Sequence, residues 1–272
     1  MKKLISFNLI LCIFAILLTA CENVKTATVS GENAQFTTLR IDSAIVGEKI
    51  GDTNQTWDTE QHIIYPVFVG ATADLLNKAV IKMFCDDSLK AASVRQCFNK
   101  KNIFMEYAMA LKESPGVKEI GFSRRDSIFV GKSTSKIISL TDYKEVFIGG
   151  AHGWEEVIHK NLNPVTGAEY KIEDFFKPNI EEELTKIGEK CFREQFLPKL
   201  GFKPTDALSE ASCFHGGIFY LSGNCGLAKT GITFVYSNYE IGSFSLGTPE
   251  FTIPFSQLNP LLKKEWAAEF AK

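Results

Sequence analysis

Two stretches of the chain repeat apolar residues at helical spacing. The first, DLLNKAVIKMFCDD, begins at Asp74 and predicts an amphipathic helix that lies on a sheet. The second, NIEEELTKIGEKCFREQF, begins at Asn179, which we expect to cap the helix, with Glu182 completing a capping box. The apolar face of this second helix consists of Ile180, Leu184, Ile187, Cys191 and Phe192.

Before, between and after these helices, the sequence has the composition and alternation of strands. QHIIYPVFV, KIISL and KEVFI are such segments, and an NPVTG turn joins two further extended pieces, EEVIHKNL and AEYKI. The last third alternates Phe, Tyr and Ile with small or polar residues in GITFVYSNY and IGSFSLGTPEFTIPFSQL, and a short helix, LNPLLKKEWAAEF, follows. The sequence therefore predicts strands on both sides of the second helix.

The order strand, helix, strands, helix, strands is typical of an α+β fold. We expect antiparallel sheets with amphipathic helices packed on one face, arranged in two lobes. The NPVTG turn marks the expected boundary, which gives an N-terminal α+β domain at residues 36–162 and a C-terminal α+β domain at residues 163–272.

The N-terminus has the pattern of an export signal. A basic start, MKK, precedes the apolar run LISFNLILCIFAILL, which is shorter than the ~20 residues that a membrane-spanning helix needs. The run ends in LTAC, and small residues before a cysteine are typical of bacterial lipoproteins. We therefore expect a lipoprotein signal peptide at residues 1–20, a lipid on Cys21 and a polar tether at residues 21–35. An ordinary secretory signal peptide is the alternative.

Composition permits a large core and argues against one class of partner. Hydrophobic residues make up 45% of the 272 residues, and the chain has 22 Phe. The 30 basic and 32 acidic residues nearly balance, and no basic stripe stands out, so we expect no nucleic-acid partner. No motif indicates a cofactor.

The cysteines in the body of the chain are candidates for disulfides in an oxidising envelope. Cys85 and Cys97 are twelve residues apart, and so are Cys213 and Cys225. Closing a loop of this size stabilises a fold by roughly 2–3 kcal/mol. Cys191 lies on the apolar face of the second predicted helix, where we expect a buried thiol.

One glycine-rich segment, VFIGGAHGWEEVIHKNLNPVTGAEY, presents His152 directly before Trp154 and Glu155. Glycines supply positive φ and close approach, so a plain turn is one interpretation. The other is a recognition loop, because an exposed aromatic ring beside carboxylates suits a basic partner or a sugar. A second glycine-rich loop begins at His215. The candidate binding residues are His152, Trp154, Glu155 and His215.

The nucleophiles and bases of the chain do not form a known catalytic pattern. His152, His159 and His215 are candidate bases, and Ser222 and Ser243 lie near glycines, but GxSxG and SxxK motifs are absent. His152 and His159 are seven residues apart, unlike the i, i+4 pair of a helical zinc site. We therefore expect neither catalysis nor a metal. The alternative is a peptidoglycan- or glycan-acting hydrolase or deacetylase-like enzyme that uses His152 and a carboxylate.

Two motifs in the second half carry a family resemblance. GGAHG…N…TG…I.DFF runs from Gly149 to Phe176, and FVYSNYEIGSFSLGTPEFTIPFSQL runs from Phe234 to Leu258. Together they resemble the RsiV-type extracytoplasmic domain of unknown function, found in the ectodomain of a lysozyme-sensing anti-sigma factor and usually preceded by a PdaC-type N-terminal domain. The resemblance implies an α+β envelope module without established catalytic residues, one member of which binds lysozyme.

These observations predict a lipid-anchored binding protein of the bacterial cell envelope. The chain would be held to a membrane by its N-terminal lipid and would face the periplasm or the exterior. Its expected partner is a protein, with a lysozyme-like protein as the first candidate, or a cell-wall glycan.

Overall fold

The computed structural model describes residues 35–45, 52, 58–85, 90–100 and 121–270. The expected signal peptide, the lipidation site Cys21 and the tether up to residue 34 lie outside this part of the chain.

Six strands form the first sheet, in the order β1-β2-β3-β4-β5-β6. Neighbouring strands are antiparallel, except that β2 and β3 run parallel. The expected α+β class is confirmed, and the parallel pair is the one departure from purely antiparallel sheets. The strands are β1 (Gln35–Ile45), β2 (Thr59–Val69), β3 (Ser123–Ser133), β4 (Ile138–Phe147), β5 (Trp154–Leu162) and β6 (Glu169–Tyr170).

Two helices, α1 (Ala73–Phe84) and α2 (Val94–Lys100), cover one face of this sheet. Leu76, Val80 and Phe84 of α1 are buried at the spacing that the sequence predicts, and burial of such side chains stabilises the fold by about 1.5–3 kcal/mol each. The expected disulfide between Cys85 and Cys97 is present and joins the end of α1 to α2, with the two Cα atoms 5.9 Å apart.

A second unit follows the first sheet. Strands β7 (Cys225–Leu227), β8 (Gly231–Val235) and β9 (Glu250–Pro254) form an antiparallel sheet. Helices α4 (Glu181–Gln195), α5 (Phe255–Leu258) and α6 (Lys264–Phe270) pack with it, together with the 3₁₀ turns η3 (Ile172–Asp174), η4 (Leu197–Leu200), η5 (His215–Gly217) and η6 (Phe244–Leu246).

An aromatic cluster fills the core of this second unit. The buried ring of Phe192 on α4 has five aromatic neighbours with centroids 5.1 to 6.1 Å away. The neighbours are Phe196, Phe214, Phe219, Tyr236 and Phe251. Offset and edge-on ring pairs of this kind contribute about 0.5–1.5 kcal/mol each beyond their buried area. Many of the Phe residues in the sequence are thus core residues.

Helix α4 begins differently from the expectation. Asn179 has a φ of 61° and Ile180 occupies the N-cap position, with no side-chain hydrogen bond capping the helix. The expected Asn179 cap is therefore wrong. Glu181, Glu182 and Glu183 in the first turn complement the positive end of the helix instead.

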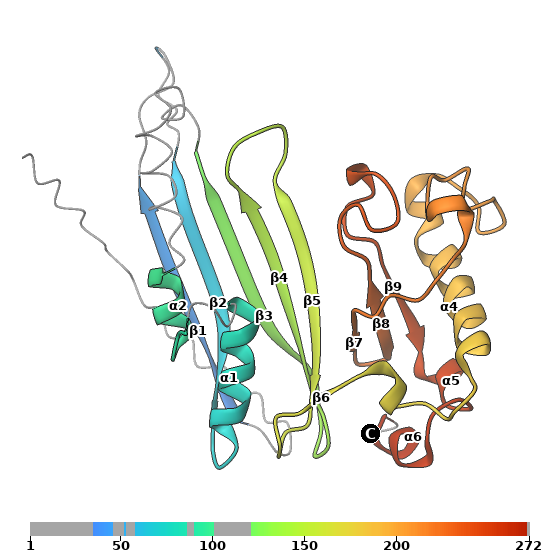
Figure 1. Cartoon of the computed structure of the whole chain (residues 1–272), viewed down its shortest axis with the longest axis horizontal. Helices are drawn as coiled ribbons and strands as arrows, with labels where there is room; N and C mark the ends of the chain where they lie inside the picture. Colours follow the sequence, from blue (N-terminus) through green and yellow to red (C-terminus); the bar gives the residue numbers. More distant parts are fainter. Residues whose placement is uncertain (1–34, 46–51, 53–57, 86–89, 101–120, 271–272) are drawn as a thin grey trace, which may run out of the picture.

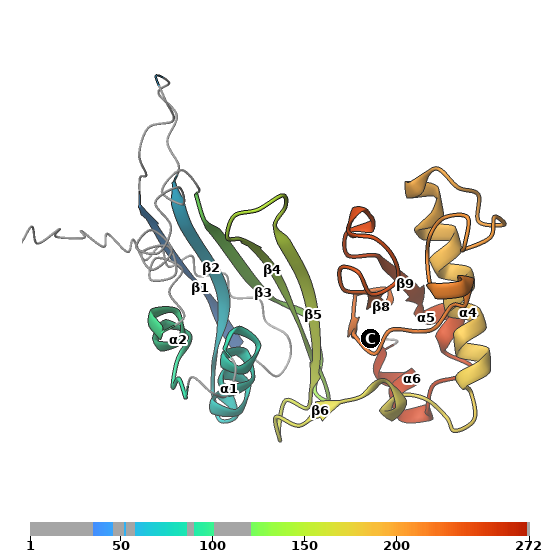
Figure 2. The same ribbon diagram turned by 45° about the horizontal axis from the view of Figure 1, so that its top comes forward.

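The second unit contacts the face of the first sheet opposite to the helices (Figures 1 and 2). Side chains alternate along a strand, so Leu140 of β4 faces α1 whereas Ser139 faces β7. Ser139 Oγ accepts the N–H of Leu227 at 3.0 Å, and Asn161 Nδ2 of β5 donates to the carbonyl of Cys225 at 2.8 Å. Polar side chains on buried positions thus join the two units.

The expected bridge between Cys213 and Cys225 is wrong. Both residues are free, buried thiols. Cys213 lies in the turn before η5 and donates from Sγ to Ala211 O at 3.5 Å, whereas Cys225 opens β7 and is tied to the first sheet. A spacing of twelve residues does not require the two ends to meet when each is held by a different neighbour. Cys191 is a buried thiol on α4, as the helical pattern predicts.

The helix-covered face of the first sheet also buries charged side chains. Arg124 Nε lies 2.6 Å from Asp126 Oδ2, and its guanidinium lies over the ring of Phe84. Asp142 is fully buried, with Lys144 Nζ 3.3 Å from its Oδ2. Burial raises the pKa of Asp142 to about 7, because the attraction of Lys144 only partly offsets the loss of solvation.

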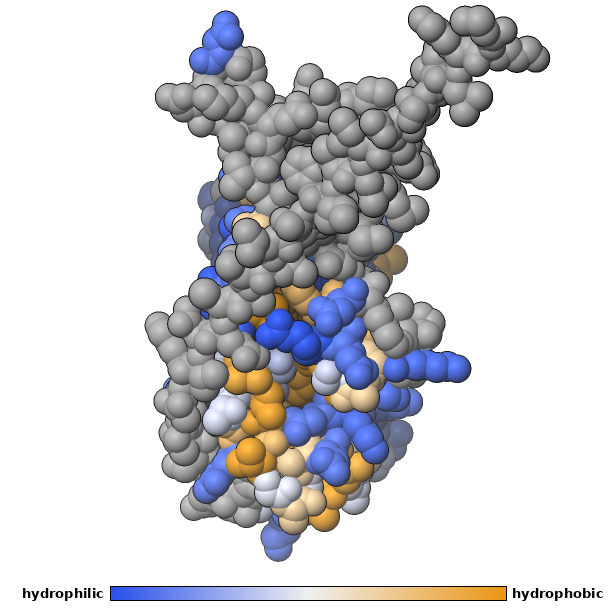
Figure 3. Space-filling model, turned by 90° about the vertical axis from the view of Figure 1, so that its left-hand side faces the viewer, coloured by the Kyte–Doolittle hydropathy of each residue, from blue (hydrophilic) through white to orange (hydrophobic). Residues whose placement is uncertain are grey.

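The side of the molecule nearest β1 is shown in Figure 3. Over the coloured part of this face, hydrophobic residues lie in groups between hydrophilic ones. No helix in the described part of the chain is both long enough and apolar enough to span a bilayer.

Candidate functional site

The β4–β5 loop, residues 148–153, requires its glycines. Gly149 and Gly150 have φ values of 96° and 98°, a region that side-chain-bearing residues rarely adopt. A Cβ on Gly153 would lie 3.1 Å from the carbonyl oxygen of Val146. The loop can therefore turn sharply and place the next residues, His152 and Trp154, at the end of the hairpin.

The ring of His152 is held on both of its nitrogens and on one face. It stacks on Phe244 with centroids 3.7 Å apart and an interplanar angle of 19°. Nδ1 lies 2.9 Å from the carbonyl of Gly153, and Nε2 lies 3.3 Å from the hydroxyl of Tyr239. In the neutral ring the proton is therefore on Nδ1, which donates to Gly153, and Nε2 accepts from Tyr239.

The β4–β5 loop packs against the segment 237–247. Asn238 Oδ1 accepts the N–H of Glu155 at 3.3 Å, so the loop and the segment are also joined next to Trp154. Within the segment, Glu240 Oε2 accepts the N–H of Ser237 at 2.8 Å. The two motifs that carry the family resemblance in the sequence, about ninety residues apart, thus contact each other directly.

His215 lies on another loop that is attached to the same segment. The N–H of Phe214 donates to Ile241 O at 2.6 Å and fixes the turn that carries His215, and the hydroxyl of Tyr220 donates to Glu240 at 3.3 Å. The His215 side chain is exposed, and no contact between it and His152 is found among the described residues. Both glycine-rich loops therefore contact segment 237–247, but the two histidines do not form one site.

Tyr239 contacts the stacked pair, with its ring 5.7 Å from that of Phe244, and two further exposed aromatic residues lie on the segments attached to it: Trp154 at the start of β5 and Tyr220, which bonds to Glu240. Trp154 is 46% exposed, Tyr239 58% and Tyr220 43%, although large aromatic side chains are usually mostly buried. We call the group of His152, Trp154, Tyr220, Tyr239 and Phe244 the aromatic tip. The sequence singles out His152 and Trp154, but Tyr220, Tyr239 and Phe244 become recognisable only when the loops are seen together.

A groove of about 240 Å³ lies beside the tip, between strands β4 and β5 and the second unit. Arg125 forms an ion pair with Glu145 at 3.4 Å. No ion pair of Glu155 or Glu250 is found in the described part of the chain. The groove has a net negative charge, because four glutamates and two lysines line it. Its charged lining residues are Glu145, Glu155, Glu156, Glu250, Lys144 and Lys199.

The other candidate bases and hydroxyls are used structurally. His159 lies in the junction between the two units, where Nδ1 is 2.9 Å from Thr141 Oγ1, and burial lowers its pKa to about 4. Ser222 Oγ accepts the N–H of Asn224 at 3.0 Å, and the Ser243 hydroxyl bonds to that of Ser245. In the described residues, no group of three or more His, Cys, Asp or Glu side chains is arranged to hold a metal ion.

Comparison with protein families gives a match in the second half of the chain. Residues 173–256 match the model of DUF3298, a protein family of unknown function. The match includes the 237–247 segment of the tip, whereas the β4–β5 loop precedes it.

Two solved structures are similar to the chain over most of its length. A DUF3298 family member from Bacteroides fragilis NCTC 9343 has a TM-score of 0.69 at 19% identity, covering 91% of this chain and 100% of that one. A DUF3298 family protein from Pseudomonas aeruginosa PAO1 has a TM-score of 0.59 at 19% identity, covering 84% and 95%. At this identity the similarity establishes the fold and not an activity. A comparison with curated proteins found no match.

Proposed function

We propose that this chain is a non-catalytic binding protein of the bacterial cell envelope, held to a membrane by a lipid on Cys21. Its aromatic tip and the adjoining acidic groove recognise a basic protein, with a lysozyme-like protein as the first candidate and a cell-wall glycan as the alternative. In this proposal the chain is an RsiV-type module preceded by a PdaC-type domain. The observation that carries it is the His152–Phe244 stack, which fixes an exposed aromatic surface between two loops.

The rigidity of the tip supports a binding role. The stack and the hydrogen bonds to Tyr239 and Gly153 hold the His152 ring in place before any partner arrives. Side chains that are already ordered lose little conformational entropy on binding, which favours affinity. Exposed Trp and Tyr side chains are also the residue types enriched among the strongest contributors to protein interfaces.

The charge of the groove supports the choice of a basic partner. Glu155 lines this groove and directly follows Trp154 in β5, where successive side chains point to opposite faces of the sheet. Glu250 adds a second carboxylate to the groove. Acidic surfaces attract basic proteins over several ångströms and increase the rate of encounter, an effect that salt weakens.

The test compares the exported chain with single variants in a pull-down on immobilised lysozyme and on immobilised muropeptides. We expect Trp154→Ala and His152→Ala to weaken lysozyme binding by at least about tenfold, as for residues at the centre of an interface, and Glu155→Gln to reduce it and its salt dependence. Val165→Ala, another exposed side chain outside the tip, is the control.

The outcomes separate the interpretations. Retention of muropeptides and not of lysozyme, lost in Trp154→Ala, would favour the glycan. If the tip variants bind each ligand as well as the wild type does, with unchanged melting temperatures, the tip has no role in binding. The membrane anchor is tested separately, because Cys21→Ser should abolish incorporation of labelled palmitate.

A further inference from the structure

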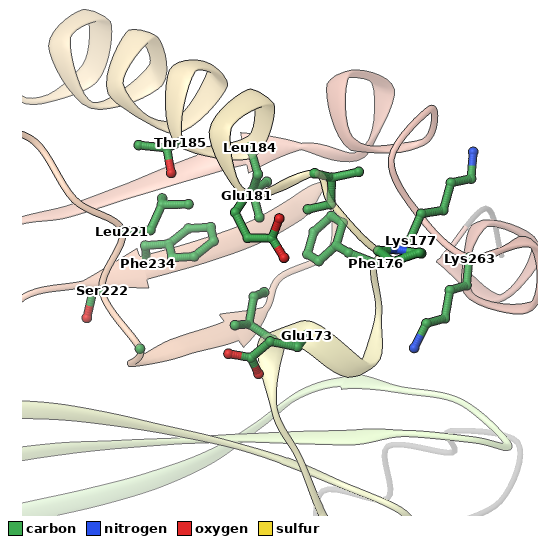
Figure 4. A pocket seen from close by; sticks show the side chains of 14 residues that line it. Glu173, Phe176, Lys177, Glu181, Leu184, Thr185, Leu221, Ser222, Phe234 and Lys263 are labelled. Atoms are coloured by element: carbon green, nitrogen blue, oxygen red, sulfur yellow. The ribbon is translucent and has the colours of Figure 1, made fainter.

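A second cavity lies in the C-terminal unit and shares no residue with the aromatic tip. It has a volume of about 480 Å³ and lies between the start of α4, the segment 172–180, the loop 221–223 and β8 (Figure 4). This volume is within the range of small-molecule sites, roughly 300–1,000 Å³. Its apolar lining residues are Ile172, Phe176, Ile180, Leu184, Leu221 and Phe234.

The lining of this cavity includes two carboxylates and two ammonium groups, which are placed differently. In Figure 4 the carboxylates of Glu173 and Glu181 lie among the apolar side chains of the lining, whereas the ammonium end of Lys177 points away and that of Lys263 lies to one side, beyond Phe176. Both ammonium groups donate to backbone carbonyl oxygens, at 2.7 Å and 2.8 Å. No ion pair of either ammonium group with Glu173 or Glu181 is found among the described residues, so both carboxylates are available to a ligand.

The surroundings disfavour an anionic ligand. A helix N-terminus ordinarily attracts anions, but the first turn of α4 carries Glu181, Glu182 and Glu183. The field of Glu173 reaches the strand beneath the cavity, where burial and then this carboxylate raise the pKa of the Cys225 thiol to about 12. An apolar space bordered by two carboxylates is complementary to an apolar body that carries a positive charge.

We propose that this cavity binds a small organic cation, whose apolar body packs against Phe176, Leu221 and Phe234 and whose ammonium or guanidinium group is held by Glu173 and Glu181. The site is additional to the proposed recognition of a partner by the tip. Loss of one therefore leaves the other intact.

The experiment uses three probes with the same apolar body and different charge: 4-phenylbutylamine, 4-phenylbutan-1-ol and 4-phenylbutanoate. Isothermal titration of each into the folded chain should give the tightest binding for the amine, weaker binding for the alcohol and the weakest for the acid. Similar affinities for all three, or no binding of the amine, would overturn the proposal.

Variants locate the site. Glu173→Gln combined with Glu181→Gln should weaken amine binding by roughly tenfold and leave alcohol binding unchanged, as expected for two partly exposed charge pairs. Glu183→Gln removes the same charge from the same helical turn outside the cavity lining and serves as the matched control. Thr185→Phe, which fills the cavity, should abolish binding of both probes.

If Thr185→Phe does not fold, as judged by circular dichroism, the double glutamine variant and the probe series still decide the question. An equal loss of amine binding in Glu183→Gln and in the double variant would contradict the assigned site. Lysozyme binding in the double variant should equal that of the wild type, which separates this proposal from the one for the tip.

Discussion

Replacing Asp142 by Asn should change how the stability of the chain depends on pH. The carboxyl group is fully buried beneath α1, and Lys144, which is close to it, also donates to the carbonyl of Met83 at 2.9 Å. The charged form is therefore poorly solvated, and the pKa of Asp142 rises to about 7. In the unfolded chain the same group titrates near ~3.9.

The direction and the size of the change in unfolding free energy follow from these two pKa values. A carboxyl group with a raised pKa in the folded state contributes stability that is fully present below the unfolded pKa and is lost as the pH rises through 7. With about 1.4 kcal/mol per pKa unit, the free energy of unfolding should fall by roughly 2–3 kcal/mol between pH 5 and pH 8 through this group alone. Asp142→Asn cannot ionise, so its unfolding free energy should lack this decrease.

Urea denaturation followed by circular dichroism measures this difference at both pH values, with equal denaturant slopes as the check on a two-state comparison. The exposed Asp74 provides the control, and Asp74→Asn should keep the wild-type pH dependence. The same decrease from pH 5 to pH 8 in Asp142→Asn and in the wild type would refute the reasoning.

Three further predictions concern the junction and the cysteines. A Cβ on Gly226 would overlap the ring of His159 at Nδ1, so Gly226→Ala should lower the free energy of unfolding by about 1–3 kcal/mol. The loss should be smaller in a His159→Ala background, and an equal loss in both backgrounds would argue against this contact. Because the pKa of His159 is lowered to about 4, the stability that its neutral ring contributes is fully present above pH ~6.5 and is lost as the pH falls through 4. His159→Gln should lack this loss, and the same acid dependence of unfolding in the variant and the wild type would contradict it. A thiol reagent applied to the denatured, unreduced chain should modify Cys191, Cys213 and Cys225 and spare Cys85 and Cys97; modification of Cys85 would disprove the disulfide.

Periodic patterns located the elements well. The repeat of Leu76, Val80 and Phe84 predicts α1, and this prediction is confirmed because a helix on a sheet buries every third or fourth side chain. The parallel pairing of β2 with β3 could not be predicted in the same way. Alternation along a strand defines which side chains share a face, but it does not define the neighbouring strand or its direction.

Sequence patterns could not predict which distant segments of the chain contact one another. His152 stands out because glycines surround it, but its stacking partner, Phe244, is one of many aromatic residues and only the fold brings them together. Equal spacing likewise did not distinguish Cys85 and Cys97, which lie on neighbouring helical segments, from Cys213 and Cys225, which do not bond. Asn179 has the residue type of a helix cap and instead adopts a left-handed conformation before α4.

Amide hydrogen exchange of the chain with and without lysozyme tests the central claim, that the aromatic tip is a binding surface for a basic protein. The account predicts slower exchange in residues 148–155 and 237–247 when lysozyme is added, with exchange in α1 unchanged. Unchanged exchange at the tip under conditions where lysozyme is bound, or slowing confined to α1, would contradict it.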